Sequence, residues 1–178
     1  NIEIKARVIE LDKLRSIAES IASEPSQIFN QEDVFFHTGK GRLKLRILSE
    51  TNGELIHYDR PDTCRVKLSR YQIYKTSMPN ELRQLLSMSL GEIITVKKKR
   101  EIFKVGQTRI HLDKVDELGI FMELEVVLSP DQAPEDGRTI AIDLMKKLGI
   151  NETDLISGAY ADILLARAEE YTGSEILT

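Results

Sequence analysis

Hydrophobic and polar residues alternate along much of this chain up to position 128. In the segment 41–47, Gly-Arg-Leu-Lys-Leu-Arg-Ile, every second residue is cationic and the residues between them are apolar. Successive side chains of a β-strand point to opposite faces, so this segment would have one cationic face and one apolar face. Patterns of this kind predict strands over residues 1–9, 27–38, 42–49, 54–60, 64–74, 92–105, 108–113 and 120–128.

Other stretches repeat their apolar residues at the spacing of a helix. These patterns predict helices over residues 12–23, 80–89, 138–148 and 152–168. Asp12 stands at the position of an N-cap for the first of them. The pair Asn52-Gly53 is typical of a short hairpin turn, so the strands on either side of it should pair antiparallel. Mostly antiparallel strands with inserted and appended helices indicate an α+β fold.

The polar faces of the predicted strands leave two architectures open. An open sheet would expose its charged face to water, whereas a sheet closed into a barrel would enclose that face in a polar lumen. Alternation alone favours the two equally. Cations, however, stand as same-face pairs on several strands, and carboxylates cluster separately at Glu3 and at Asp113, Glu123 and Glu125. We therefore expect a closed antiparallel β-barrel with helices packed outside.

Length and composition narrow the class of protein. A chain of 178 residues can bury a sizeable core, and we expect one domain over residues 1–178. No apolar run reaches membrane-spanning length, so we expect no membrane partner. The single cysteine, Cys64, excludes an internal disulfide and a cysteine-based zinc site, which favours a cytoplasmic location. The net charge of −4 argues against a nucleic-acid partner.

The charged residues suggest a specific chemistry. Same-face residues two positions apart in a strand lie roughly 7 Å apart. That spacing lets Lys44 and Arg46 contact adjacent phosphoryl groups, and lets Glu123 and Glu125 hold one or two divalent ions. Carboxylate oxygens without a cysteine or histidine cluster suit Mg²⁺ or Mn²⁺. Cations together with a carboxylate-bound metal describe a polyphosphate site, because each phosphate charge needs a donor or an ion.

Several short motifs occur in an order typical of one family. They are Asn1-Ile-Glu3-Ile-Lys5, Leu43-Lys44-Leu-Arg46, Tyr58-Asp-Arg60-Pro, Lys98-x-Arg100, Arg109-Ile-His-Leu-Asp113, Gly119-Ile-Phe-Met-Glu123-Leu-Glu125 and Gly158-Ala-Tyr160-Ala-Asp162. In this order they resemble the CYTH superfamily of class IV adenylyl cyclases, thiamine triphosphatases and inorganic triphosphatases, and are most similar to proteins labelled class IV adenylyl cyclase-like. The family's signature begins Glu-x-Glu-x-Lys, so Asn1 replaces the first acid.

The resemblance implies a triphosphate tunnel and roles for individual residues. The substrate-binding residues would be Lys5, Lys44, Arg46, Arg60, Lys67, Lys98, Arg100 and Arg109. The ligands of Mg²⁺ or Mn²⁺ would be Glu3, Asp113, Glu123 and Glu125, and the catalytic residues would be Glu123, Glu125 and Lys98. Alternation leaves the inward parity of residues 97–100 open, and only the resemblance selects Lys98 and Arg100. We expect His111 to be a hydrogen-bonding wall residue.

The expected function is metal-dependent hydrolysis of a linear triphosphate, with inorganic tripolyphosphate as the simplest substrate. The first alternative is an adenylyl cyclase that converts ATP to cyclic AMP and pyrophosphate, but it needs an adenine pocket that the sequence does not identify. A second alternative is a non-catalytic polyphosphate- or nucleotide-binding protein, motivated by Asn1. Thiamine triphosphate ranks third among substrates, since the chain has no Trp. The protein would act as a monomer or homodimer on a small-molecule triphosphate or nucleotide.

Overall fold

The computed structural model describes residues 1–59 and 70–174, and residues 60–69 and 175–178 lie outside the description. The described strands are β1 (Ile2–Arg7), β2 (Gln27–Phe36), β3 (Arg42–Ser49), β4 (Asn52–Asp59), β5 (Arg70–Thr76), β6 (Glu92–Val105), β7 (Thr108–Val115) and β8 (Gly119–Val126). The helices are α1 (Leu11–Ile21), α2 (Pro79–Leu90), α3 (Pro134–Leu148), the short 3₁₀ helix η1 (Glu152–Asp154) and α4 (Tyr160–Ser174).

The described strands form one antiparallel sheet in the order β1-β8-β7-β6-β2-β3-β4-β5. The predicted α+β class is therefore confirmed. The two edge strands both border the same cavity, through Lys5 of β1 and Ile73 of β5, so the sheet curls around it. Between the described residues of β1 and β5 no hydrogen bonds close the sheet, so the predicted closed barrel is not established.

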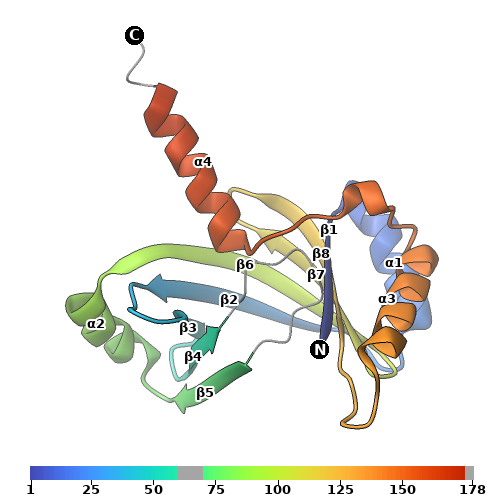
Figure 1. Cartoon of the computed structure of the whole chain (residues 1–178), viewed down its shortest axis with the longest axis horizontal. Coiled ribbons are helices and arrows are strands. Elements are labelled where there is room, and N and C mark those ends of the chain that lie inside the picture. Colours follow the sequence, from blue (N-terminus) through green and yellow to red (C-terminus); the bar gives the residue numbers. More distant parts are fainter. Residues whose placement is uncertain (60–69, 175–178) are drawn as a thin grey trace.

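Most of the hydrophobic core lies on the outer face of the sheet, and a further cluster packs the start of α4 against Phe35 and Val96 on the inner face. On one side α1 and α3 pack against β1, β6, β7 and β8, where Leu14, Leu144 and Met145 meet Phe103 and Met122. On the other side α2 covers β2 and β3. Figure 1 shows α1 and α3 together at one end of the sheet, α2 at the other, and α4 projecting away from it. The apolar faces of the alternating strands thus lie under helices, which leaves the polar faces for the cavity.

The segment predicted as a helix over 152–168 is different in the structure. Only η1 and α4 are helical, and between them the chain is extended and pairs with β1. The amide of Ile156 donates to the carbonyl of Lys5 at 2.9 Å, and Leu155 forms a bridge with Ala6. Gly158, with φ of 96°, then turns the chain into α4. Residues 155–156 pair with the backbone of β1 at the edge of the sheet, although their periodicity alone favours a helix.

Two further local predictions are wrong. The N-cap of α1 is Glu10, and Asp12 lies in the first turn. The hairpin between β3 and β4 turns at residues 50–51, because Ser49 pairs with Asn52. The predicted strand 64–74 is described only from Arg70 onward, so Cys64 lies outside the described residues. None of the helices in the described ranges is long and apolar enough to cross a membrane.

Candidate functional site

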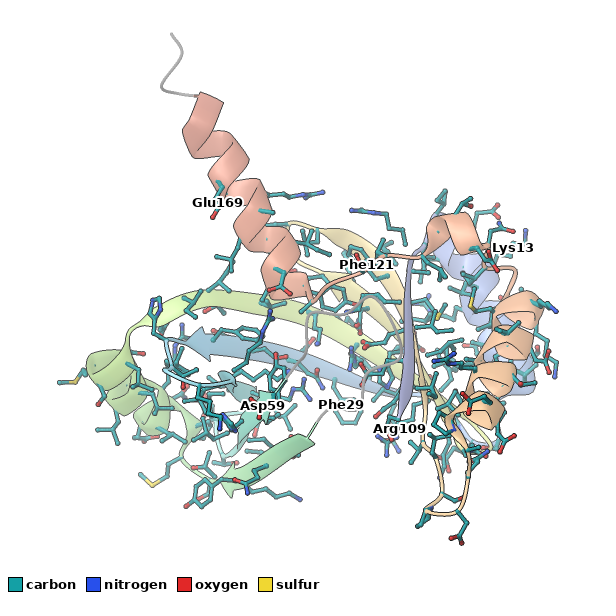
Figure 2. All side chains as sticks on the ribbon, viewed as in Figure 1. Lys13, Phe29, Asp59, Arg109, Phe121 and Glu169 are labelled. Carbon is teal, nitrogen blue, oxygen red and sulfur yellow. The ribbon has the colours of Figure 1, made fainter. Side chains whose placement is uncertain are left out.

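A cavity of about 680 Å³ lies on the inner face of the curled sheet. It is lined by residues of all the described strands and by residues 159–161 at the start of α4. Its cationic walls include Lys5, Lys44, Arg46, Lys98, Arg100 and Arg109, which are the predicted substrate-binding residues that the structure describes. Arg60 and Lys67 lie outside the described residues. Figure 2 shows Arg109 and Phe29, two lining residues, near the N-terminal end of β1.

The strand β6 shows how the pattern of residues places charges in the cavity. Lys98 and Arg100 are buried and point inward, whereas Lys97 and Lys99 are exposed on the outer face. Alternation in a strand requires one of these two parities but does not select between them. The side chains that point into the cavity are thus those of Lys98 and Arg100, as the family resemblance implied.

Asp33 on β2 is the centre of a buried charge cluster. Its carboxylate accepts two hydrogen bonds from Arg46, from Nε at 2.8 Å and from Nη2 at 3.0 Å. Lys44 Nζ donates to the same carboxylate at 3.1 Å, and Lys98 Nζ lies 3.6 Å from it. Antiparallel pairing puts Asp33 directly opposite Arg46 and next to β6. We refer to Asp33, Lys44, Arg46 and Lys98 as the Asp33 cluster.

The cluster changes the proton affinities of its members. Although burial alone would raise the pKa of Asp33, the attraction of Lys44, Lys98 and Arg46 holds it well below its usual range. Burial lowers the pKa of Lys98 to about 7, against the opposing attraction of Asp33. Burial also lowers the pKa of Lys44, again against the attraction of Asp33. The two lysines can therefore gain proton affinity when an anion enters the cavity.

A second buried group lies beside the first. Arg100 makes a bidentate pair with Asp113, with both N–O distances at 2.6 Å, and also donates to Glu123 at 2.9 Å. The Tyr160 hydroxyl donates to Asp113 at 2.8 Å. Asp113 is fully buried and, although burial alone would raise its pKa, its hydrogen bonds from Arg100 lower that pKa. Asp113 thus fixes Arg100 and Tyr160 in place, and its side chain does not line the cavity as Glu123 does.

Carboxylates gather where β1 meets β8. Glu3 lies opposite Glu125 in the strand pairing, and Lys5 lies opposite Glu123. Glu125 accepts hydrogen bonds from Asn1 Nδ2 at 2.8 Å and from Arg109 at 3.1 Å. All of these side chains line the cavity, so three of the four predicted metal ligands share one wall. The Asp33 cluster, on β2, β3 and β6, forms a cationic wall of the same cavity.

The acidic wall offers oxygen ligands to a divalent ion. Among the described residues, no three acidic, histidine or cysteine side chains converge closely enough to hold a metal by themselves. Mg²⁺, however, is usually held by one or two carboxylates together with phosphate oxygens and water. Glu3, Glu123 and Glu125 supply hard oxygen donors facing the cavity, so this wall fits a metal that binds together with a phosphate substrate.

His111 lies in the same wall, opposite Glu123 in the pairing of β7 with β8. Its ring is buried, with Nδ1 at 3.9 Å from Glu123 and Nε2 at 3.8 Å from Glu125. Neither ring nitrogen has a hydrogen-bond partner among the described residues. Burial lowers the pKa of this imidazole. The prediction that His111 is a wall residue agrees with its position, and within the described residues its ring nitrogens lie beside two carboxylates at distances longer than a usual hydrogen bond.

A smaller pocket of about 270 Å³ adjoins the cavity. Phe35 and Ala161 line both spaces. The rest of its wall combines apolar residues such as Phe36 and Ile94 with Arg42, which pairs with Asp162 at 3.0 Å. The pocket can therefore take a partly apolar group attached to an anion in the cavity.

Sequence reasoning missed two residues of this site. Asp33 was not predicted, although an acid inside a strand is unusual and lies on the same parity as Phe35. Tyr160 stands in one of the family motifs without an assigned role, but its ring lies under Lys5 Nζ at 4.2 Å and its hydroxyl reaches Asp113. An acid at an inward strand position was a usable signal, whereas no local pattern places Tyr160.

Comparison with known proteins places these features in a family context. The family model of the CYTH domain matches residues 1–160. A Methanocaldococcus jannaschii protein named as a candidate adenylate cyclase is 23% identical over 169 residues, covering 91% of this chain and 97% of that protein. Adenylate cyclase CyaB of Aeromonas hydrophila is 23% identical over 168 residues, covering 89% and 85%. The solved structure of a Pyrococcus horikoshii protein superposes with a TM-score of 0.79 at 25% identity, covering 90% and 97%.

Proposed function

Because this chain belongs to the CYTH domain family, we propose that its cavity binds a linear triphosphate and hydrolyses it, with inorganic tripolyphosphate as the simplest substrate. The observation that carries the proposal is that one cavity is lined both by the cations of the Asp33 cluster and by the carboxylates of the acidic wall, Glu3, Glu123 and Glu125. A phosphate chain needs a donor or an ion for each charge, and the two walls offer both. The proposal includes closure of the curled sheet into a tunnel.

The residues of the two walls have different parts in this proposal. Lys44, Arg46 and Lys98 bind phosphoryl oxygens and stabilise the charge on the transferring group. Mg²⁺ or Mn²⁺, held by Glu3, Glu123 and Glu125, would neutralise phosphate charge and lower the pKa of an attacking water. Ligation by Asp113 stays a prediction, and it would require the contacts of Asp113 with Arg100 and Tyr160 to break.

An adenylyl cyclase is the second candidate, and one observation favours it. The pocket beside the cavity shares Phe35 and Ala161 with the polyphosphate site, so it could hold the adenosine of ATP while the phosphates lie among the cations. Two relatives carry names that refer to adenylate cyclase. The reaction would then be attack of the ribose 3′-hydroxyl on the α-phosphorus, with release of pyrophosphate.

One assay separates the candidates. The purified protein is incubated with Mg²⁺ and either tripolyphosphate or ATP, and orthophosphate, pyrophosphate and cyclic AMP are measured. We expect orthophosphate and pyrophosphate from tripolyphosphate and no cyclic AMP from ATP. Cyclic AMP with stoichiometric pyrophosphate would replace the first proposal by the second. Binding without any turnover would leave a non-catalytic polyphosphate-binding protein.

A single substitution tests the acidic wall within the same assay. Glu123→Gln should abolish metal-dependent turnover while largely sparing the binding of tripolyphosphate, since it removes a carboxylate and keeps the cationic wall. Asp116→Asn, an exposed carboxylate in the turn between β7 and β8, serves as the control and should turn over normally. An unchanged rate in Glu123→Gln would refute the metal assignment.

A further inference from the structure

Asp33 has an arrangement that binding of a phosphate chain does not by itself require. Phosphate anions are attracted by cations, and a carboxylate among those cations competes with them. Yet Asp33 lies at 3% exposure against Lys44, Arg46 and Lys98, which are three of the cations that face the cavity. Its negative charge therefore requires an explanation other than direct contact with the substrate.

The geometry of the cluster suggests what the carboxylate does. Both oxygens are used, Oδ1 by Arg46 Nε and Oδ2 by Arg46 Nη2 and Lys44 Nζ. A bidentate pair fixes the plane of the guanidinium, and the flanking lysines are drawn to the same point from two neighbouring strands. The single carboxylate of Asp33 then aligns three cationic side chains. The cluster still has a net positive charge, which attracts an anion.

We propose that Asp33 is a positioning residue, which holds Lys44, Arg46 and Lys98 charged and aligned on the cavity wall before a polyphosphate enters. The inference rests on the proposed binding of a triphosphate in this cavity. Asp33 does not touch the substrate. It acts through the three cations, which would otherwise repel one another in a buried place.

A purely structural role is the competing explanation. A buried ion pair is often no more stable than apolar residues of the same volume, so stability alone is a weak reason for four charged groups here. The two roles differ in their dependence on pH. An aligning carboxylate raises the proton affinity of the lysines, and its removal should matter only where those lysines can lose their protons.

Other charged and titratable groups around the cluster must be considered in such a test. Those that face it from neighbouring elements are Glu54 and Tyr58 on β4, Arg100 on β6, Asp113 on β7 and Tyr160 on α4. All of them remain in an Asp33→Asn variant. The change in pH dependence between variant and wild type therefore isolates the contribution of Asp33, and the protonation of tripolyphosphate itself cancels in the same comparison.

The experiment is isothermal titration of the full chain with inorganic tripolyphosphate without metal, at about pH 5.5 and about pH 8.5, on either side of the Lys98 pKa of about 7. Asp33→Asn should bind nearly as well as wild type at the lower pH. At the higher pH its dissociation constant should be weaker by about tenfold relative to wild type, the effect of one unit of pKa. A ratio of dissociation constants that is the same at both pH values would overturn the inference.

Controls keep the result specific. Glu32→Gln changes the neighbouring carboxylate of β2, which does not line the cavity and pairs with Arg83 at a distance of 2.6 Å. This variant should bind tripolyphosphate as wild type does at both pH values. If Asp33→Asn does not fold, the same comparison is made in a Lys98→Met background, where one buried cation fewer remains. There too the added Asp33→Asn change should weaken binding more at the higher pH, and an equal effect at both would refute the inference. Wild type that binds no tripolyphosphate at either pH would overturn the proposed function as well.

Discussion

At the scale of single residues, the amine of Lys98 is an unusual group because it is buried among other cations. Its side chain is 5% exposed, on the wall of a cavity that also contains Arg100 and Lys44. Burial lowers its pKa to about 7, and the attraction of Asp33 only partly offsets this. A lysine with such a pKa can change its charge near neutral pH, which links the stability of the protein to pH.

The first prediction concerns that link. The folded pKa of Lys98 lies below the ordinary 10.5, so between these values the unfolded chain binds more protons and the free energy of unfolding rises with pH. Lys98→Met should reduce this rise between about pH 7 and about pH 9.5, as measured by denaturant unfolding. Lys97→Met, at the exposed neighbouring position, should leave the slope unchanged. Identical slopes in all three proteins would contradict the assigned burial of the Lys98 amine.

A second prediction concerns the pair of Arg100 and Asp113. Arg100→Met leaves the fully buried carboxylate of Asp113 without its bidentate partner, and should lower the free energy of unfolding by about 3–5 kcal/mol. Adding Asp113→Leu removes the stranded charge and should recover part of the loss, because the cost lies mainly in the unpaired group. Thermal and denaturant unfolding check both variants. If Arg100→Met alone is as stable as wild type, the ion pair of Arg100 and Asp113 is not buried in solution.

Residues of the site could be predicted from sequence to different extents. Lys44 and Arg46 follow from strict alternation in one short strand, so their shared face needs no other information. For Lys98 alternation left two parities, and only the family resemblance chose between them. Asp33 joins the site because β2 pairs with both β3 and β6, a contact between strands that local periodicity does not contain.

At the scale of elements, the hairpin of β3 and β4 shows how a correct prediction can rest on the wrong local reason. Asn52-Gly53 predicted the hairpin, but the turn lies at residues 50–51. Gly53 instead lies under α2, where an added Cβ would come within 2.7 Å of the Cβ of Pro79. The packing of a helix that begins 26 positions later, at Pro79, requires a glycine here. Rules for turn residues do not include such a long-range contact.

The third prediction follows from this contact. Gly53→Ala should lower the free energy of unfolding by about 1–3 kcal/mol, because α2 must shift from the sheet to admit the methyl group. Gly39→Ala is the matched control, since a Cβ at Gly39 meets nothing within 4 Å, and it should be neutral or slightly stabilising. Urea unfolding of the two variants measures the difference. Equal stability of both would mean that α2 does not pack tightly at this point.

The region after α3 marks where element prediction fails. Periodicity suggested one helix over 152–168, yet residues 155–156 pair with the edge strand β1 and only then does α4 begin. The extended segment places the carbonyl of Gly158 at 3.3 Å from Lys5 Nζ and brings Tyr160 over the cavity. Pairing with an edge strand that is distant in the sequence determines the conformation of this segment. The sequence pattern of the segment alone was therefore not sufficient to predict it.

At the scale of the whole molecule, the distribution of charge differs from its sum. The chain has a net charge of −4, but its inner sheet face gathers six of the predicted binding cations around one cavity. Antiparallel strands with one cationic parity produce this arrangement when the apolar parity is covered by α1, α2 and α3. An acidic protein can thus bring several cations together on the wall of one cavity, where three cations share the single carboxylate of Asp33.

The last prediction uses this arrangement to test the cavity without any assumption about turnover. Cations that repel one another in the free cavity gain partners when a polyanion binds, so the ligand should stabilise the folded state. At a tripolyphosphate concentration of about 100 times its dissociation constant, the gain should be about 2.7 kcal/mol. For a domain of this length, that corresponds to a rise in melting temperature of about 5–10 °C.

Differential scanning fluorimetry with and without Mg²⁺ measures the rise in melting temperature. Orthophosphate at matched ionic strength is the control, because it spans fewer of the cations and should stabilise less. Added NaCl should reduce the effect of tripolyphosphate only modestly, since the pairs around Asp33 are buried and buried charges are screened less than surface ones. A shift that vanishes at moderate salt would instead indicate binding at exposed groups such as Lys97 and Lys99, on the opposite face of β6. The same shift with orthophosphate as with tripolyphosphate would refute recognition of a phosphate chain.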